Sequence, residues 1–266
     1  MTSNFISRGA QVYDAFMGRW SKLLAPLFLD FAGVGSSERV LDVGCGTGNL
    51  AFALAMHADV AAIEAIDYED EFIEALRQRN TDPRVTAQQG DACSLPFPTG
   101  RFDRALSMLV LPVVSDPQCA VSEMRRVVRA GGVAAATVWD FYGGMPSRRI
   151  FWDTVAALDP EANDRRRKAV CLPMMQPGEL KDAFAKAGFV GITDTLLTIR
   201  MDYENFDDYW HPFMAAREYI ASLPENTREQ VQSRVQAAYL CNKPDGPRSF
   251  AGVAWAVRGV VPDRYR

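Results

Sequence analysis

The stretch VLDVGCGTGNL, from Val40 to Leu50, decides how the rest of the chain is interpreted. An apolar run that carries one aspartate leads into three glycines, Gly44, Gly46 and Gly48, and an apolar helical pattern then begins. This order predicts a buried strand, a tight turn and the start of a helix. A glycine-rich turn lets a ligand lie against bare backbone, close to a helix N-terminus.

Strands and helices alternate along the residues that follow this stretch. Apolar runs predict five strands, at residues 40–43, 60–66, 85–89, 102–106 and 133–139. Helical spacing predicts helices at 49–57, 69–79 and 117–129, the last one ending at Gly131 and Gly132. This alternation is typical of an α/β fold with a Rossmann-like, doubly wound, mostly parallel sheet. Ligands of such sheets bind beyond the carboxyl ends of the strands.

The regular alternation stops after residue 140. A helix is expected at 177–188, strands at 189–200 and 250–260, and helical structure over 1–31 and 203–240, which gives a seven-stranded sheet. We therefore expect residues 1–266 to form one domain. Its core comprises about 32–140, 177–200 and 249–262, and two inserted helical segments, about 141–176 and 203–248, form a cap or lid.

Composition excludes several classes of protein. The net charge of −4 argues against bulk affinity for nucleic acid. The five cysteines include no CxxC pair, so neither a zinc site nor a disulfide framework is expected, and no metal site is predicted. The start of the chain lacks the apolar core of a signal peptide, and no long apolar run predicts a membrane span. We expect a cytoplasmic protein, either a monomer or a homodimer.

An aspartate, Asp67, follows the second predicted strand, 19 residues after Gly48. A carboxylate at this position could accept hydrogen bonds from both hydroxyls of a ribose. The alternative is a helix N-cap, because aspartate is favoured there and three acidic residues follow in the first turn. Both roles are compatible with one another.

Another aspartate, Asp91, follows the third predicted strand. It could accept a hydrogen bond from the exocyclic amine of an adenine, or it could be a solvated turn residue after Gly90. The dinucleotide fingerprint is GxGxxG, whereas the spacing here is GxGxG. The glycine spacing and the second acid therefore favour a nucleoside ligand other than a dinucleotide.

Five successive segments together resemble the class I S-adenosylmethionine-dependent methyltransferases. They are VLDVGCGTGNL, AIDYEDEFIEALR, QGDACSLPF, FDRALSMLVL and RRVVRAGGVAAATVWD. The resemblance covers about residues 10–140 and is nearest to the small-molecule branch that includes the ubiquinone/menaquinone and type 11 methyltransferases. It implies S-adenosylmethionine as cofactor, S-adenosylhomocysteine as product and a small-molecule acceptor.

The resemblance also implies a set of cofactor-binding residues at the carboxyl ends of the first four strands. They are Asp42, Gly44, Cys45, Gly46, Gly48, Asp67, Tyr68, Asp91, Ala92, Ser107 and Met108. In this scheme the glycine turn, Ser107 and Met108 pack against the cofactor's methionine and ribose portions. Asp67 holds the ribose hydroxyls, and Asp91 holds the adenine amine.

Further roles follow from the same resemblance. Asp42 would orient the glycine turn and could reach the cofactor's ammonium group through a water molecule. Tyr68 would lie against the adenine face, and Ala92 would offer its backbone N–H to the ring. Tyr13 and Arg19 could reach the cofactor carboxylate, to which arginine is well suited. The alternative for these two is a surface helix.

The sequence offers few candidates for a general base. Relatives often carry a Leu-His-His-like stretch after the fourth strand, whereas this chain has Leu111-Pro112-Val113. His57 is expected to be structural, and His211 is a weak catalytic candidate that could also be a polar residue at a helix end. Methyl transfer by in-line displacement needs mainly alignment, so a base is required only if the acceptor loses a proton.

The leading hypothesis is therefore methyl transfer to a small molecule. Aromatic residues near His211 make an apolar or aromatic acceptor plausible. Two alternatives stay open at this point. One is an NAD(P)-dependent oxidoreductase on a similar sheet, and the other is a non-catalytic protein that binds S-adenosylmethionine.

Overall fold

The structure is a computed structural model that describes residues 14–57, 59–159, 161–211 and 217–263. Two compact units divide the chain. Unit 1 consists of Met1–Val138, Pro173–Leu197 and Ala254–Arg266, and unit 2 of Trp139–Leu172 and Thr198–Val253. Three of the four boundaries between the units fall inside strands. Each unit is described below by itself.

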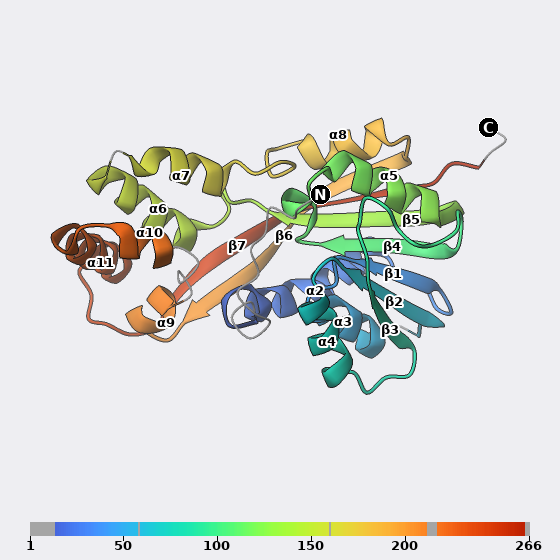
Figure 1. Ribbon diagram of the computed structural model, residues 1–266, viewed down its shortest axis with the longest axis horizontal. Helices are drawn as coiled ribbons and strands as arrows, with labels where there is room; N and C mark the ends of the chain where they lie inside the picture. Colours follow the sequence, from blue (N-terminus) through green and yellow to red (C-terminus); the bar gives the residue numbers. More distant parts are fainter. Residues whose placement is uncertain (1–13, 58, 160, 212–216, 264–266) are drawn as a thin grey trace. The chain divides into compact units, whose positions relative to one another are not determined.

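A seven-stranded sheet forms the framework (Figure 1), as predicted. Its strands, in the order β3-β2-β1-β4-β5-β7-β6, are β1 Arg39–Val43, β2 Ala62–Asp67, β3 Val85–Gln89, β4 Phe102–Met108, β5 Val128–Trp139, β6 Val190–Tyr203 and β7 Arg248–Val260. Strands β1 to β5 pair in parallel. Strand β7 runs antiparallel to β5, because Gly131 donates to the Val261 carbonyl and Asp140 to that of Val253.

The strand order places a topological switch between β1 and β4. The chain passes from β1 outward to β2 and β3, and then returns to β4 on the other side of β1. Ligands of open α/β sheets bind at such a switch, beyond the carboxyl ends of the strands. The expected site therefore lies where β1 leads into the glycine turn.

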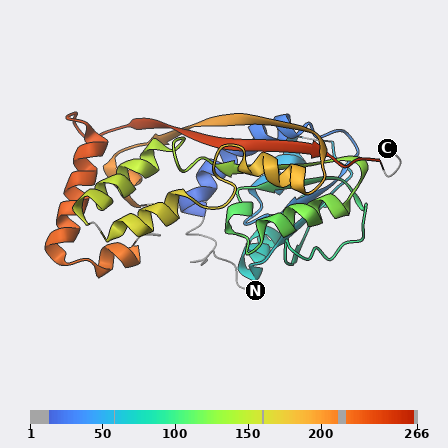
Figure 2. The same ribbon diagram turned by 90° about the horizontal axis from the view of Figure 1, so that it is seen from above.

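Helices of unit 1 cover both faces of its part of the sheet (Figures 1 and 2). On one face lie α2 Arg19–Ala32, α3 Asn49–His57 and α4 Asp70–Arg79, and on the other lie α5 Pro117–Val127 and α8 Glu179–Lys186. A π-helical turn, η1 Asp14–Gly18, precedes α2. Because β1 and β4 are covered on both faces, nearly all of their residues are buried.

The boundary between α5 and β5 differs from the prediction. The helix ends at Val127, and β5 begins at Val128 and continues through both glycines. Gly131 has a φ of 71°, and a Cβ on Gly132 would lie 2.6 Å from the Asp103 carbonyl oxygen. The β4–β5 register shifts at this point. The two glycines therefore form an irregularity within the strand and do not end the helix as predicted.

A buried ion pair joins β4 to the residues just before β1. The Arg104 guanidinium is 6% exposed, and its Nε and Nη2 donate to Glu38 at 2.7 and 2.9 Å. Its Nη1 donates to the Ala32 carbonyl at 2.5 Å, at the end of α2. This one side chain therefore connects a strand, a helix and a loop.

The sheet has an outer strand, β3, whose backbone is partly protected. Arg77 of α4 donates two hydrogen bonds to the Ala87 carbonyl, from Nε at 3.2 Å and from Nη2 at 2.8 Å. The Thr86 hydroxyl lies 3.5 Å from the Ile63 carbonyl oxygen.

Unit 2 contains helices packed around an aromatic core. Its helices are α6 Pro146–Leu158, α7 Ala162–Val170, α9 Phe206–Trp210, α10 Arg217–Ser222 and α11 Glu225–Leu240. Tyr209 is fully buried, contacts the rings of Tyr203 and Tyr239, and donates to the Ser147 carbonyl at 2.7 Å. These aromatic side chains are therefore used in internal packing.

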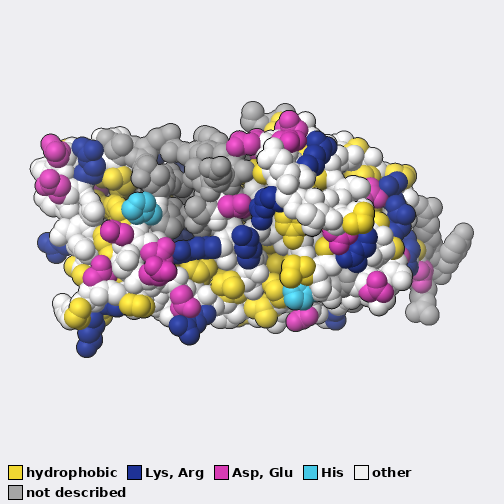
Figure 3. Space-filling model, turned by 90° about the horizontal axis from the view of Figure 1, so that it is seen from below, with side chains coloured by type: hydrophobic (Ala, Val, Ile, Leu, Met, Phe, Trp, Pro, Cys, Tyr) yellow, Lys and Arg dark blue, Asp and Glu magenta, His cyan; other side chains and the backbone are white. Residues whose placement is uncertain are grey.

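The described part of the chain contains no helix that is both long and apolar enough to cross a membrane. In the face drawn in Figure 3, acidic and basic side chains are interspersed with apolar ones. All five cysteines are free thiols.

Candidate functional site

The glycine turn connects β1 to α3 and is held by backbone hydrogen bonds. The Gly44 and Cys45 nitrogens both donate to the Ile66 carbonyl, at 2.8 and 3.0 Å, and Gly48 donates to the Cys45 carbonyl at 3.0 Å. Gly44 has a φ of 74°, and a Cβ there would lie 2.4 Å from Cγ1 of Val110. Both the backbone conformation and the close packing therefore require glycine at this position.

The Asp67 carboxylate at the end of β2 reaches this turn. Its Oδ2 accepts from the Gly46 nitrogen at 2.8 Å, and its Oδ1 accepts from the Glu69 nitrogen at 3.0 Å. Burial raises the pKa of Asp67, and these two hydrogen bonds oppose the rise. Asp67 lies two residues before Glu69, the N-cap of α4, so it supports the helix start without being its cap. Its ribose-binding role stays a prediction.

A second carboxylate, that of Asp42, is buried beside the turn. Asp42 is 1% exposed, and burial together with the nearby Asp67 raises its pKa to about 8. Its carboxylate lies near the Ala51 amide, but neither oxygen has a hydrogen-bond partner of normal geometry among the described residues. Because an unpaired buried carboxylate is costly, this position fits a donor group supplied by a ligand or by water.

A small cavity lies among Asp42, the glycine turn and the end of β4. It measures about 10 Å³, room for about one water molecule. Its lining includes Ser21, Asp42, Gly44, Cys45, Thr47, Asn49, Leu50 and Met108. Met108 is one of these lining residues, and its contact with the cofactor stays a prediction. Ser107, the next residue toward the start of the strand, is fully buried with no partner for its hydroxyl among the described residues.

The Asp91 carboxylate forms a turn of its own. Its Oδ1 accepts from the Cys93 nitrogen at 2.8 Å, and the Ser94 nitrogen donates to the Asp91 carbonyl at 3.0 Å. The preceding Gly90 nitrogen donates to the Asp67 carbonyl at 2.8 Å, which links the ends of β2 and β3. The turn role therefore exists, and it uses only one carboxylate oxygen. Ala92 is half-buried within this turn.

The other expected contacts lie around this group. The Tyr68 side chain is 45% exposed, next to Asp67, and Gln89 donates to its carbonyl at 3.0 Å. The Arg19 guanidinium lies 4.1 Å from the ring centroid of Trp20. Tyr13 lies outside the described residues.

Polar contacts from the N-terminal segment are the part of the site that sequence reasoning missed. Asp14 accepts from the Thr47 hydroxyl at 2.5 Å, and the Asn49 amide donates to the Gly18 carbonyl at 3.2 Å and to the Ser21 hydroxyl at 2.8 Å. The polar residues Thr47 and Asn49, which follow the glycines, were the available signal.

The weak catalytic candidate, His211, belongs to unit 2. Its side chain is exposed, and its Nδ1 lies 2.9 Å from the Asp207 carbonyl oxygen at the end of α9. These contacts are those of a polar residue at a helix end. A catalytic role for His211 stays a prediction. His57 is exposed at the end of α3.

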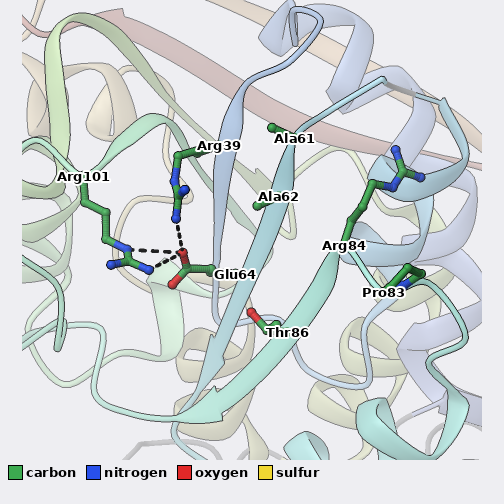
Figure 4. Close-up of a pocket in the computed structure, with 8 residues that line it drawn as sticks. All are labelled: Arg39, Ala61, Ala62, Glu64, Pro83, Arg84, Thr86 and Arg101. Carbon is green, nitrogen blue, oxygen red and sulfur yellow. Dashed lines mark hydrogen bonds and ion pairs between the residues drawn. The ribbon is translucent and has the colours of Figure 1, made fainter.

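A second pocket lies at the opposite ends of the strands (Figure 4). It is lined by Arg39, Ala61, Ala62, Glu64, Pro83, Arg84, Thr86 and Arg101. Arg39 and Arg101 both bind the same Glu64 oxygen, at 3.2 and 2.6 Å. Because ligands of this type of sheet bind at the carboxyl ends, this pocket is the weaker candidate for an active site.

Comparison with known proteins shows what kind of domain the chain contains. Residues 41–136 match the model of a family described as a methyltransferase domain. Over 126 residues the chain is 36% identical to 2-methyl-6-phytyl-1,4-hydroquinone methyltransferase 2 of rice, Oryza sativa subsp. japonica. Over these residues the chain carries a methyltransferase domain. The aligned stretch is 46% of this chain and 36% of the rice enzyme, so the chain spans about a third of that relative's length.

Solved structures share the fold of the methyltransferase domain. The YcgJ protein of Bacillus subtilis has a TM-score of 0.60 at 21% identity, over 92% of this chain and 99% of that one. Phosphoethanolamine N-methyltransferase 2 of Haemonchus contortus, solved with S-adenosylhomocysteine, has a TM-score of 0.60 at 17% identity. The match covers 96% of this chain and 57% of that one.

Methyltransferases of this fold have been solved with S-adenosylmethionine and with S-adenosylhomocysteine bound, and the residues at the glycine turn fit such a ligand. Only glycine fits at position 44, because a Cβ there would collide with Val110. The turn therefore presents bare backbone to a ligand. The Asp42 carboxylate, without a partner in the described region, suits a cationic or hydrogen-bond-donating group.

Proposed function

We propose that the chain transfers a methyl group from S-adenosylmethionine to a small-molecule acceptor by in-line displacement. The observation that carries this proposal is a pair of acids at a glycine turn, at the sheet's topological switch: Asp42 is buried beside the turn, and Asp67 accepts a hydrogen bond from its Gly46 nitrogen. The alternative of an NAD(P)-dependent oxidoreductase has no support in the relatives found.

The cofactor-binding set is part of this proposal. Asp67 binds the ribose, Asp91 binds the adenine amine through the oxygen that its own turn leaves unused, and Tyr68 covers the adenine face. Asp42 faces the ammonium group directly or through water. Ala92, Cys45 and the three glycines offer backbone contacts, Ser107 and Met108 line the methionine portion, and Tyr13 and Arg19 bind its carboxylate.

In the proposed mechanism the bound cofactor supplies an electrophilic methyl group and a good leaving group. The chain's residues bind and orient, and they exclude water from the reacting atoms. Leu111-Pro112-Val113, a 3-10 turn after β4, offers no side chain able to take a proton. His211 is the described residue retained as a candidate base, for acceptors that must lose a proton.

The acceptor is proposed to be a small organic molecule with apolar or aromatic character. Support comes from the rice relative, which its name describes as a hydroquinone methyltransferase. Segments 141–176 and 203–248 are proposed to form the cap that selects the acceptor. A cytoplasmic location and a monomeric or homodimeric state complete the proposal; light scattering on the purified chain distinguishes the two states.

Isothermal titration with S-adenosylhomocysteine tests the cofactor assignment, and NAD⁺ and NADP⁺ serve as controls. Saturable binding of S-adenosylhomocysteine alone is expected, whereas binding of only a dinucleotide would refute the proposal. Turnover is then measured with radiolabelled cofactor and a panel of quinols, phenols and amines. Cofactor binding with no methylated product from any member would favour the non-catalytic binding protein.

A further inference from the structure

The described N-terminal segment is attached to the glycine turn through the Asp14 carboxylate. Oδ1 of Asp14 accepts from the Thr47 hydroxyl at 2.5 Å, and Oδ2 pairs with Nη1 of Arg79 at 3.0 Å. The same Arg79 nitrogen donates to the Thr47 carbonyl at 3.2 Å. Thr47 is therefore held at its side chain and at its carbonyl by two residues that also bind each other.

These contacts join three separate parts of unit 1. Asp14 belongs to the π-helical turn, Thr47 to the glycine turn and Arg79 to the end of α4. The Thr47 side chain lies in the interior, because the residue is 1% exposed. A π-helical turn is uncommon and occurs frequently at functional sites.

The glycine turn is consequently fixed from two sides. Asp67 holds the Gly46 nitrogen at 2.8 Å, and Asp14 and Arg79 hold the next residue, Thr47. The Cys45–Gly46 peptide, through its N–H, and the Thr47–Gly48 peptide, through its carbonyl, are thus each held by a hydrogen bond. A turn whose amides already point in the bound direction binds its ligand with a smaller ordering cost.

We propose that Asp14 is a positioning residue that fixes the cofactor-binding turn through Thr47 and Arg79. The inference rests on the proposed function, because it concerns the affinity of the same turn for the methyl donor. Asp14 acts on the cofactor indirectly, by presetting the backbone around Thr47.

Gly18 provides a variant that separates positioning from folding. A Cβ added at Gly18 would lie 2.8 Å from Oδ1 of Asp14, so Gly18→Ala pushes this carboxylate away from Thr47. The Gly18 backbone is already helical, with φ −59° and ψ −38°, and alanine favours helix over glycine. We expect Gly18→Ala to keep or raise the melting temperature and yet to weaken S-adenosylhomocysteine binding about threefold or more, from loss of a charge-assisted hydrogen bond.

A double-mutant cycle tests the route through Thr47. Asp14→Ala and Thr47→Val are each expected to weaken S-adenosylhomocysteine binding by about three- to tenfold. The double variant should lose little more than the worse single one, because both remove the same contact. Asp103→Ala is the matched control: its carboxylate binds Arg129 and the Arg39 amide at the amino end of β4, so cofactor affinity should not change.

Titration calorimetry and melting curves of all five variants and the wild type decide between the outcomes. Wild-type affinity in both Gly18→Ala and Thr47→Val would overturn the positioning role and leave the proposed function intact. Additive losses in the double variant would overturn the coupling through Thr47. Failure of the wild-type chain itself to bind S-adenosylhomocysteine would overturn the proposed function, and the inference with it.

Discussion

The Asp67 carboxylate lies 2.8 Å from the Gly46 nitrogen, so the end of β2 holds the middle of the glycine turn directly. A single side chain thereby links the end of β2 to the turn that follows β1, at the carboxyl edge of the sheet. The same carboxylate is the expected partner of the ribose hydroxyls.

Replacing Asp67 should therefore reduce cofactor affinity in two ways at once. Asp67→Ala removes the proposed ribose contacts and releases Gly46, and S-adenosylhomocysteine binding is expected to weaken by about 1–3 kcal/mol. Calorimetry measures this loss, with Asp70→Ala in the first turn of α4 as a nearby acidic control. An unchanged affinity would contradict the assignment of Asp67 to the ribose.

The buried Asp42 predicts a pH dependence of stability. Burial and Asp67 raise its pKa to about 8, so between about pH 4 and pH 8 the native state binds a proton that the unfolded chain releases. The free energy of unfolding should therefore fall as the pH rises through this window. The Asn side chain of the Asp42→Asn variant does not titrate. As the pH rises from about 4 to about 8, the free energy of unfolding of this variant should therefore increase relative to that of the wild type, by about a few kcal/mol.

Urea unfolding of both ligand-free proteins at several pH values measures this difference. A difference that stays constant between pH 4 and pH 8 would show that Asp42 is ionised in the native state throughout. Titrating groups that do not interact with Asp42 are the same in both proteins, so their contributions cancel in the comparison.

The packing of Val110 against Gly44 predicts a specific rescue. Gly44→Ala places a Cβ in contact with Val110 at a positive φ, and should lower the free energy of unfolding by about 1–3 kcal/mol. Val110→Ala removes the methyl groups that collide, so the double variant should be less destabilised than the two single losses added together. Strict additivity in thermal and urea unfolding would argue against this contact.

The environments of the cysteines predict an order of thiol reactivity. Burial and the nearby Asp42 and Asp67 raise the pKa of Cys45 well above its usual value, and burial raises that of Cys93 to about 11. Cys171 and Cys241 are exposed. Because the thiolate is the reactive form, iodoacetamide at neutral pH should label the exposed pair first. Peptide mass spectrometry over time would refute this order if Cys45 reacted as fast as Cys241.

Local patterns were sufficient to predict much of the fold. The predicted helix at 49–57 and strand at 85–89 have the observed bounds of α3 and β3, because glycines and charged residues mark their ends. The predicted start of β5 was wrong, because a glycine pair is typical both of a helix end and of an irregularity within a strand. Only the neighbouring strand, through the close approach of Asp103 to Gly132, decides between them.

The features of the site that could not be predicted from the sequence depend on contacts between residues far apart in the chain. Asp14 and Thr47 are 33 positions apart, and no spacing rule relates a π-helical turn to a glycine turn. Asp42 was noticeable in the sequence as a charge within an apolar run, but its lack of a partner in the described region depends on how β1 and β4 are covered. The acids at the strand ends could be predicted because parallel strands bring their carboxyl ends to one edge.

The hydrogen bonds from Arg77 to Ala87 have a consequence for behaviour in concentrated solution. An outer strand normally offers its unpaired backbone groups to strands of other molecules, which is a common start of aggregation. In β3, the Ala87 acceptor is already occupied twice, and the guanidinium brings a positive charge to the edge. A foreign strand would have to displace that charge before it could pair, so this end of the sheet resists growth by strand addition.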